Sequence, residues 1–279
     1  MNIRRIKLLA LASLCLPLCA IAQSEDHVSG WFSLGAEKDI NKQLSVEVGG
    51  ELRTPEQMRF SLNAGVNYKV NKYLKLGAGY TFIERRKGGT EDHYNKNGVM
   101  NGTDHIDYYL RPSHRATFDV TGTVKLWKWL RISARERYQY SYTSPTSTLD
   151  EVRTRYDVKY DGNHYYIDPT EQPEVTHKAK DGKPSFSDHV LRSRLKFELD
   201  KKKWDVTPFV FAEFHNSLSY KMTLEKIRFG AGAEYKFNKQ HFLSLAYILT
   251  ANIHDDNDGS FERVHDSMHV ISVGYNYKF

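Results

Sequence analysis

The fold is decided by the stretch FSLNAGVNYKVNKYLKLGAGYTF, which spans residues 60–82. Apolar side chains occupy alternate positions on both sides of a short polar turn at Asn71 and Lys72, and small or polar residues lie between them. Alternation with a period of two indicates β-strands whose two faces meet different surroundings. The stretch therefore predicts two strands joined by a tight turn.

The same alternation continues through most of the chain and predicts eleven strands, the first from about Val28 to Lys38. Very short polar turns alternate with longer irregular connections, of which residues 87–110 and 143–186 are the longest. Short turns at one end and long loops at the other are typical of outer-membrane barrels. We therefore predict an all-β fold, a single transmembrane antiparallel up-and-down β-barrel of 10–12 strands with short periplasmic turns and long external loops.

The strand number is a difficulty, because bacterial barrels normally have an even number of strands. Either the stretch from Val28 is not a full wall strand, which leaves ten, or a twelfth strand is hidden. Residues 152–166 also alternate and predict an external hairpin. A secreted two-sheet sandwich and a soluble lipocalin-like barrel are the alternatives, but the charged residues lie in the rows that face inward if the apolar rows meet lipid.

Composition narrows the class of protein. The mean hydropathy of −0.61 excludes a polytopic helical membrane protein, and an aromatic content of 13% excludes a disordered chain. A membrane barrel remains possible because its polar inner residues lower the average. Aromatic residues near strand ends predict the girdles of such a barrel: Trp31, Tyr73, Trp127, Trp129, Trp204, Tyr235, Phe237, Tyr275 and Tyr277.

The N-terminus has the pattern of a secretory signal. A basic segment at residues 4–7 precedes an apolar run at 8–20, and Ala-Ile-Ala at 20–22 is a cleavage pattern. We expect residues 1–22 to be a cleaved signal peptide and residues 23–279 to form the barrel, in the outer membrane of a Gram-negative bacterium.

Removal of this signal changes the charge and the cysteine content. Cys15 and Cys19 both lie within it, so the mature domain has no disulfide. Three basic residues and no acids are lost with it, which takes the net charge from +6 to +3. This near balance argues against nucleic-acid binding.

Several short runs together resemble a known family. They are Glu51-Leu52-Arg53, residues 68–80, Arg111-Pro112-Ser113-His114-Arg115, residues 135–140, residues 191–196 and Tyr235-Lys236-Phe237-Asn238-Lys239. In this order they resemble the Bacteroidota outer-membrane barrel family catalogued as domain of unknown function 2490. The resemblance covers nearly all of the mature chain. It implies an outer-membrane location and no established activity, so it assigns no functional residues.

Charged residues of both signs occupy the rows that are expected to face the barrel interior. These candidate lining residues are Glu47, Glu51, Arg115, Asp119, Arg131, Arg135, Arg137, Arg192, Arg194, Lys196, Glu198, Glu213, Arg228 and Glu234. They form either a mutually paired core or a narrow pore, in which a basic stripe on two neighbouring strands favours anions. Ten to twelve strands lie between a filled barrel and an open channel.

Two Ser/His pairs and one long loop are further candidates for function. Ser113 with His114, and Ser187 with His189, are the only pairs that suggest an outer-membrane lipid hydrolase, and neither shows a triad pattern, so we expect no enzyme. The loop 143–186 is long enough to gate the barrel or to act in surface binding and adhesion.

The acidic loop His254–Gly259 resembles a calcium loop, but its register fails because His265 stands where Glu is needed. We therefore expect no metal or cofactor. The expected partners are outer-membrane lipid and lipopolysaccharide, together with the insertion machinery, which would recognise Phe279 in the aromatic C-terminal tail.

Overall fold

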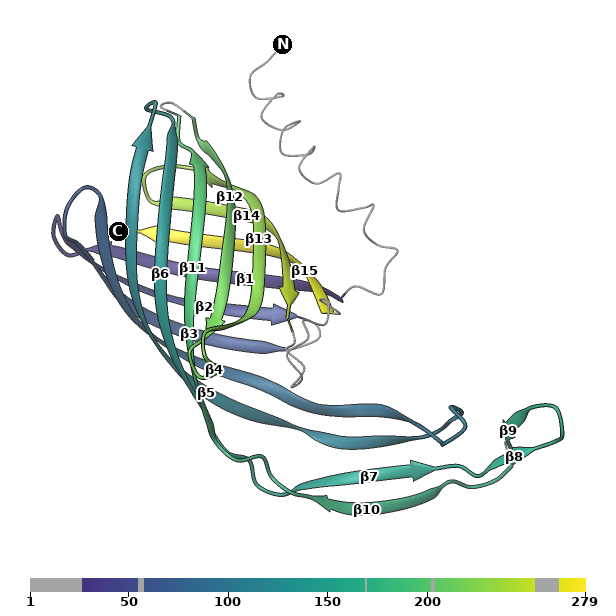
Figure 1. Ribbon diagram of the computed structural model, residues 1–279. Coiled ribbons are helices and arrows are strands. Elements are labelled where there is room, and N and C mark those ends of the chain that lie inside the picture. Colours follow the sequence, from purple (N-terminus) through teal and green to yellow (C-terminus); the bar gives the residue numbers. More distant parts are fainter. Residues whose placement is uncertain (1–26, 55–57, 169, 202–203, 254–265) are drawn as a thin grey trace, which may run out of the picture. The chain divides into compact units, whose positions relative to one another are not determined.

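A computed structural model describes residues 27–54, 58–168, 170–201, 204–253 and 266–279 (Figure 1). The expected signal peptide (1–22) and the acidic loop (254–259) lie outside these residues. Within them, no helix is long and apolar enough to cross a membrane. The strands are β1 (His27–Asp39), β2 (Leu44–Thr54), β3 (Arg59–Lys69), β4 (Leu74–Tyr94), β5 (Met100–Leu126), β6 (Leu130–Thr143), β7 (Leu149–Arg155), β8 (Val158–Tyr160), β9 (Tyr165–Ile167), β10 (Glu174–Lys180), β11 (Phe186–Leu199), β12 (Val206–Ser217), β13 (Thr223–Lys236), β14 (His241–Asn252) and β15 (Asp266–Lys278).

The chain divides into two compact units. The barrel unit comprises the described residues of 1–82, 115–141 and 188–279, and the loop unit comprises 83–114 and 142–187. Strands β4 and β5 are long enough to belong to both units, since each passes one of these boundaries.

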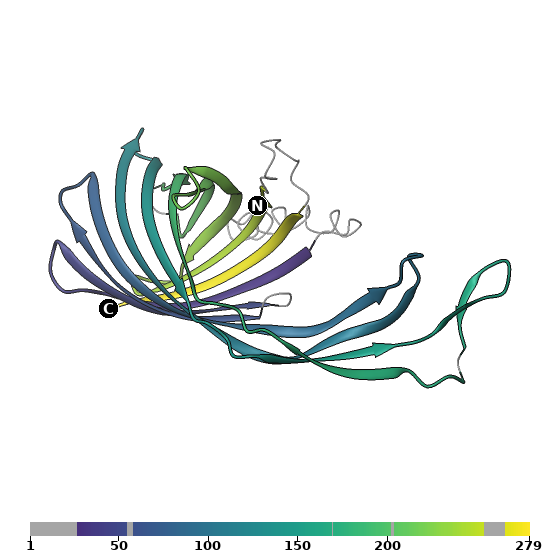
Figure 2. The same ribbon diagram turned by 60° about the horizontal axis from the view of Figure 1, so that its bottom comes forward.

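Eleven strands close the barrel unit. The ring runs β5, β4, β3, β2, β1, β15, β14, β13, β12, β11 and β6, and β6 pairs again with β5. The first and last strands lie side by side and pair in parallel, with Gly30 opposite Ile271 and Glu37 opposite Lys278 (Figures 1 and 2). An up-and-down chain with an odd number of strands has its first and last strands pointing the same way. This parallel seam therefore resolves the difficulty of strand number: β1 is a full wall strand, and the ring closes at eleven.

The short turns at one end of the barrel are built on asparagine. The side-chain oxygen of Asn41 accepts hydrogen bonds from the backbone N–H groups of Gln43 and Leu44, both at 2.8 Å. Asn71 and Asn238 make the same pair of bonds in their own turns. Such Asx turns close a tight connection locally, so the sequence alone predicted their position.

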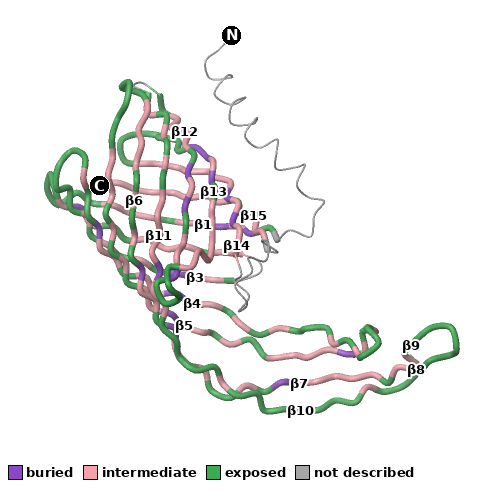
Figure 3. The backbone as a smooth tube through the Cα atoms, viewed as in Figure 1, coloured by how far each residue is buried: buried purple, intermediate pink, exposed green. Residues whose placement is uncertain are grey.

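The predicted outward rows are exposed and the rows between them are covered, as in β3, where Phe60 and Leu62 are exposed and Ser61 is buried (Figure 3). The predicted girdle residues lie at the ends of strands or in the turns at the short-turn end, except Trp31. This residue is only 7% exposed and belongs to a buried cluster with Phe211, Ile248 and Val270. Its assignment to a girdle was wrong, because its position in the alternation points it into the barrel.

The loop unit is also made of strands, whereas the sequence predicted irregular loops at 87–110 and 143–186. Its sheet has the order β4, β5, β7, β10, and β8 and β9 form a separate hairpin. The hairpin predicted at 152–166 is present only in its second part, as β8 and β9, because Val152 belongs to β7 and pairs with His105 of β5 on one side and with His177 of β10 on the other. A strand that pairs with partners distant in the chain gives no local turn signal.

Candidate functional site

The centre of the charged interior is Glu213 of β12, whose side chain has no exposed surface. Its carboxylate oxygens accept hydrogen bonds from Arg192 (2.7 Å) and Arg194 (2.6 Å) of β11, and from Arg135 (3.1 Å) of β6. Arg228 of β13 lies 3.5 Å away. Four guanidinium groups from three strands therefore surround one carboxylate.

Strand register produces this arrangement. In the pairing of β11 with β12, Arg194 is directly opposite Glu213, and in the pairing of β12 with β13, Glu213 is directly opposite Arg228. All three side chains occupy the inward rows, since the exposed apolar residues Val210 and Phe229 lie in the alternate rows. His215, two residues along the same row, completes the shell with its Nε2 2.8 Å from the carboxylate.

Three of the interior arginines also lie over aromatic rings. The guanidinium of Arg53 lies 3.6 Å from the centre of the Trp31 ring, and that of Arg228 lies 5.3 Å from the same ring. Arg194 lies 4.6 Å from the ring of Phe211. Cation–π contacts of this kind stabilise a cation that has left water. The apolar cluster and the charged cluster are therefore packed against each other.

Smaller ion pairs extend the network. Asp119 accepts two bonds from Arg137, at 2.5 and 2.6 Å. The other pairs are Glu51 with Arg53 (2.6 Å) and Arg59 (3.7 Å), Asp200 with Lys125 (2.7 Å) and Arg131, Glu198 with Lys196 (2.8 Å) and Arg131 (3.8 Å), and the hydrogen bonds Asn67–Glu47 (3.0 Å) and Arg115–Ser141 (3.3 Å).

The structure thus brings together most of the predicted lining residues, although as separate groups rather than as one stripe. Arg135, Arg192, Arg194, Arg228 and Glu213 form a single cluster. Glu234, in contrast, has no ion pair among the residues that the structure describes.

Sequence reasoning missed His215, Arg53 and the inner apolar residues. Phe209 and Phe211 lie on the inner face of β12, whereas Val210 and Ala212 lie on the outer face. Both faces of β12 are therefore apolar there. An uninterrupted apolar run is the signal that marks a strand covered on both faces.

A cavity of about 310 Å³ lies beside β1, β2 and β15 in the barrel unit. Glu47, Glu51 and Asn63 line it together with Gly35 and Gly49. A Cβ on Gly35 would come 2.8 Å from the side-chain oxygen of Asn276, so glycine preserves this space. The interior is therefore dense around Glu213 and hollow near this seam.

One member of each candidate catalytic pair, Ser113 and His189, has a side-chain contact with a hydroxyl group outside the pair. The hydroxyl of Ser113 is buried and lies 2.9 Å from that of Thr143. The Nδ1 of His189 lies 2.7 Å from the hydroxyl of Tyr138. A nucleophilic serine needs a base within hydrogen-bond reach, and these contacts are with other hydroxyl groups.

The loop unit has its own charge cluster. The side chain of Glu151 is 4% exposed, and its carboxylate oxygens lie 2.9 Å from Lys180 and 2.6 Å from Arg153. Hydrogen bonds from Lys180 and Arg153 lower the pKa of Glu151, and the bond to Glu151 raises the pKa of Lys180. Because β7 pairs with β10, this contact joins two neighbouring strands of the sheet.

Comparison with known protein families places most of the chain in one family model. The model of a family described as "Protein of unknown function (DUF2490)" matches residues 28–260, most of the chain and nearly all of the described part. No curated protein matches the sequence.

Proposed function

The chain belongs to the DUF2490 family, and we propose that this member is a non-enzymatic outer-membrane barrel of a Gram-negative bacterium whose packed interior serves as a rigid scaffold. The burial of Glu213 among four arginines carries this proposal. A wide aqueous channel would leave such side chains wetted, yet Arg192 is 11% and Arg228 is 12% exposed.

The outer surface of the barrel unit supports a membrane location. Its exposed apolar residues include Leu34, Val48 and Phe118, and Trp127 and Trp129 stack on each other at the short-turn end. A band of apolar side chains bordered by aromatic residues is the lipid-facing surface expected of an outer-membrane barrel. Fractionation of cell envelopes tests the location, with recovery in the outer-membrane fraction expected.

Conductance tests the packed interior against the pore. We expect the refolded protein to give no stepwise conductance in planar bilayers. Steps that are anion-selective, and whose selectivity is reversed by Arg135→Glu with Arg194→Glu, would establish the pore instead. Lys42→Glu with Lys72→Glu makes the same change of charge at two exposed turns and is the matched control.

Surface binding through residues 143–186 is the second candidate function. The β8–β9 hairpin exposes Tyr160, Tyr165 and Tyr166, and the first two rings lie 4.9 Å apart. Exposed tyrosines provide large contact areas at low entropic cost. Replacing all three by Ser is expected to abolish retention on immobilised polysaccharides or matrix proteins, whereas Tyr94→Ser, at another exposed position of the loop unit, is expected to leave it unchanged.

Lipid hydrolysis remains a third hypothesis and gains no support from the contacts of Ser113 and His189. It predicts fatty acid release from phospholipid that is lost on His114→Ala or His189→Ala. We expect no release above that of a heat-denatured sample.

A further inference from the structure

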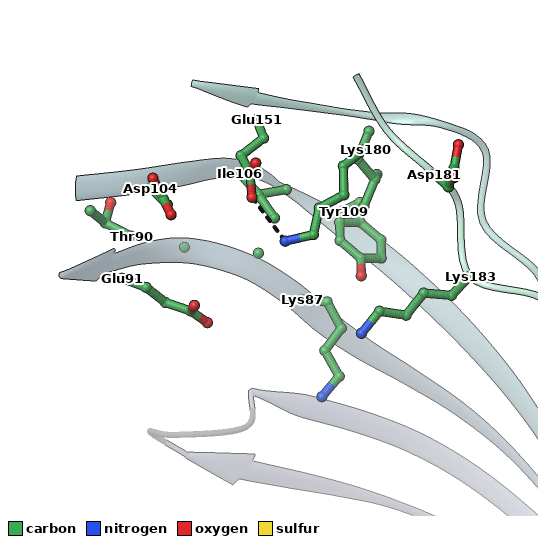
Figure 4. Close-up of a pocket in the computed structure, with 13 residues that line it drawn as sticks. Lys87, Thr90, Glu91, Asp104, Ile106, Tyr109, Glu151, Lys180, Asp181 and Lys183 are labelled. Atoms are coloured by element: carbon green, nitrogen blue, oxygen red, sulfur yellow. Dashed lines mark hydrogen bonds and ion pairs between the residues drawn. The ribbon is translucent and has the colours of Figure 1, made fainter. Parts of the chain in front are cut away.

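The loop unit contains a cavity of about 430 Å³ that is separate from the barrel interior (Figure 4). Strands β4 and β5 line it together with the connection that follows β10. Lys87, Lys183 and Tyr109 lie at one part of the cavity, and in the close-up the polar ends of these three side chains turn toward the same space.

Lys87 and Lys183 are not in ion pairs in the part of the chain that the structure describes. Burial lowers the pKa of Lys87, and the neighbouring charges of Arg85, Lys183 and Arg111 lower it further. A cluster of like charges costs free energy unless an anion joins it.

Lys183 is held in place by its backbone. Its N–H donates to the hydroxyl of Thr146 at 2.7 Å, and its carbonyl accepts from the N–H of Thr146 at 2.9 Å. Arg111 binds the carbonyls of Ser144 (3.1 Å) and Pro184 (2.7 Å), and so ties together the two segments that contain Thr146 and Lys183. The backbone of Lys183 is therefore fixed at the edge of the cavity.

Two glycines follow Lys87 and bring β4 close to β5. Gly88 and Gly89 have φ angles of +99° and +133°. A Cβ on Gly88 would lie 2.5 Å from the carbonyl oxygen of Asp107, so only glycine allows β4 to approach β5 this closely.

Four acidic side chains line the cavity, and two of them, Glu151 and Asp104, are in ion pairs. Glu151 binds Lys180 and Arg153, and Asp104 binds Arg155. The other two, Glu91 and Asp181, have no ion pair among the described residues, and neither lies within ion-pair distance of Lys87 or Lys183.

We propose that this cavity of the loop unit binds a phosphate group, with Lys87 and Lys183 as its charged partners and the hydroxyl of Tyr109 as a donor. Two ammonium groups match a dianionic phosphate in charge, and lysine binds phosphate as a point charge. The phosphate belongs either to a lipid headgroup or to a free anion. The site does not depend on whether the barrel interior is packed or open.

Calorimetric titration of the refolded full-length chain in neutral detergent tests the site. The probes are inorganic phosphate and dihexanoyl phosphatidic acid, with dihexanoyl phosphatidylcholine as the zwitterionic comparison. Tighter binding of the phosphatidic acid identifies a lipid headgroup as the source, and equal or tighter binding of inorganic phosphate identifies a free anion. Absence of binding by both would overturn the proposal.

Variants connect the binding to the two lysines. Lys87→Gln and Lys183→Gln are each expected to weaken phosphate binding about tenfold, because each removes a charge-assisted hydrogen bond. Lys87→Arg is expected to retain binding, and Lys96→Gln, at an exposed turn of the same unit, is the control. Equal affinities for all four variants and the wild type would contradict the assignment, even if the barrel folds and remains non-conducting.

Discussion

Arg194 and Glu213 face each other directly across the β11–β12 pair, with the Arg194 Nε 2.6 Å from a carboxylate oxygen. Arg194 also lies over the ring of Phe211, the next residue but one to Glu213 on the inner face of β12. A single side chain thus joins the ionic and the apolar halves of the interior.

Glu213→Gln is expected to destabilise the barrel strongly. The substitution leaves several buried guanidinium groups without an anion, and loss of one member of a buried ion network costs about 3–5 kcal/mol. Unfolding in urea, followed by the shift of the folded band in gel electrophoresis, measures the loss. Glu234→Gln, on the inner face of the neighbouring strand, is the control and is expected to change the midpoint little. An equal shift for the two variants would contradict the central role of Glu213.

Gly230→Ala is expected to destabilise the barrel because Phe211 covers this glycine. A Cβ at position 230 would lie 2.2 Å from the Phe211 ring, and overpacking of this kind costs about 1–3 kcal/mol. Adding Phe211→Ala should relieve the clash, so the two effects should not be additive. Gly122→Ala is the control, since the nearest atom to its Cβ lies 4.0 Å away. Simple additivity in the double variant would show that contact with the Phe211 ring is not the cause of the loss.

Trp31 and Trp129 are expected to differ in how strongly lipid quenches their fluorescence. A variant that retains only Trp31, with the other three replaced by Phe, should resist quenching by brominated lipid, because Trp31 is 7% exposed and lies beneath Arg53. A variant that retains only Trp129 should be quenched. Steady-state fluorescence in bilayers measures both. Quenching of Trp31 alone would reverse the assignment of the inner and outer faces.

Acid is expected to loosen the β7–β10 pair of the loop unit. The pKa of Glu151 is lowered in the folded state by its bonds to Lys180 and Arg153. Its contribution to stability is therefore present above the pKa of an unfolded glutamate, about 4.3, and is lost as the pH falls through the lower folded value. Protection factors for amide exchange in β7, corrected for intrinsic rates, measure this change. Glu151→Gln should remove the pH dependence, whereas Asp150→Asn, on the same strand, should retain it.

The contribution of Lys180 to the same ion pair depends on pH in the opposite direction. The bond to Glu151 raises the pKa of Lys180, so the contribution of Lys180 is complete below the pKa of an unfolded lysine and is lost as the pH rises through the folded value. The same exchange measurement above pH 10 tests it. Constant protection across this range would show that Lys180 does not hold the two strands together.

The sequence by itself determined the strands of the barrel unit, the short turns and the face that most rows of side chains take. These features are local: alternation assigns Phe60 and Ser61 to opposite faces, and Asn41 closes its own turn. It also placed Glu213 and its arginines in the interior. Tertiary structure alone decided which of them meet, because strand register and ring closure depend on residues far apart in the chain.

The same reason explains the remaining differences. The parallel seam between β1 and β15 follows from the closure of a ring with an odd number of strands. The burial of Trp31 follows from its neighbours Arg53 and Arg228. The strands β7 and β10 depend on pairing partners that no local sequence pattern marks. Lys87 and Lys183 lie almost one hundred positions apart and line one cavity only because the sheet of the loop unit brings β4 and the end of β10 together.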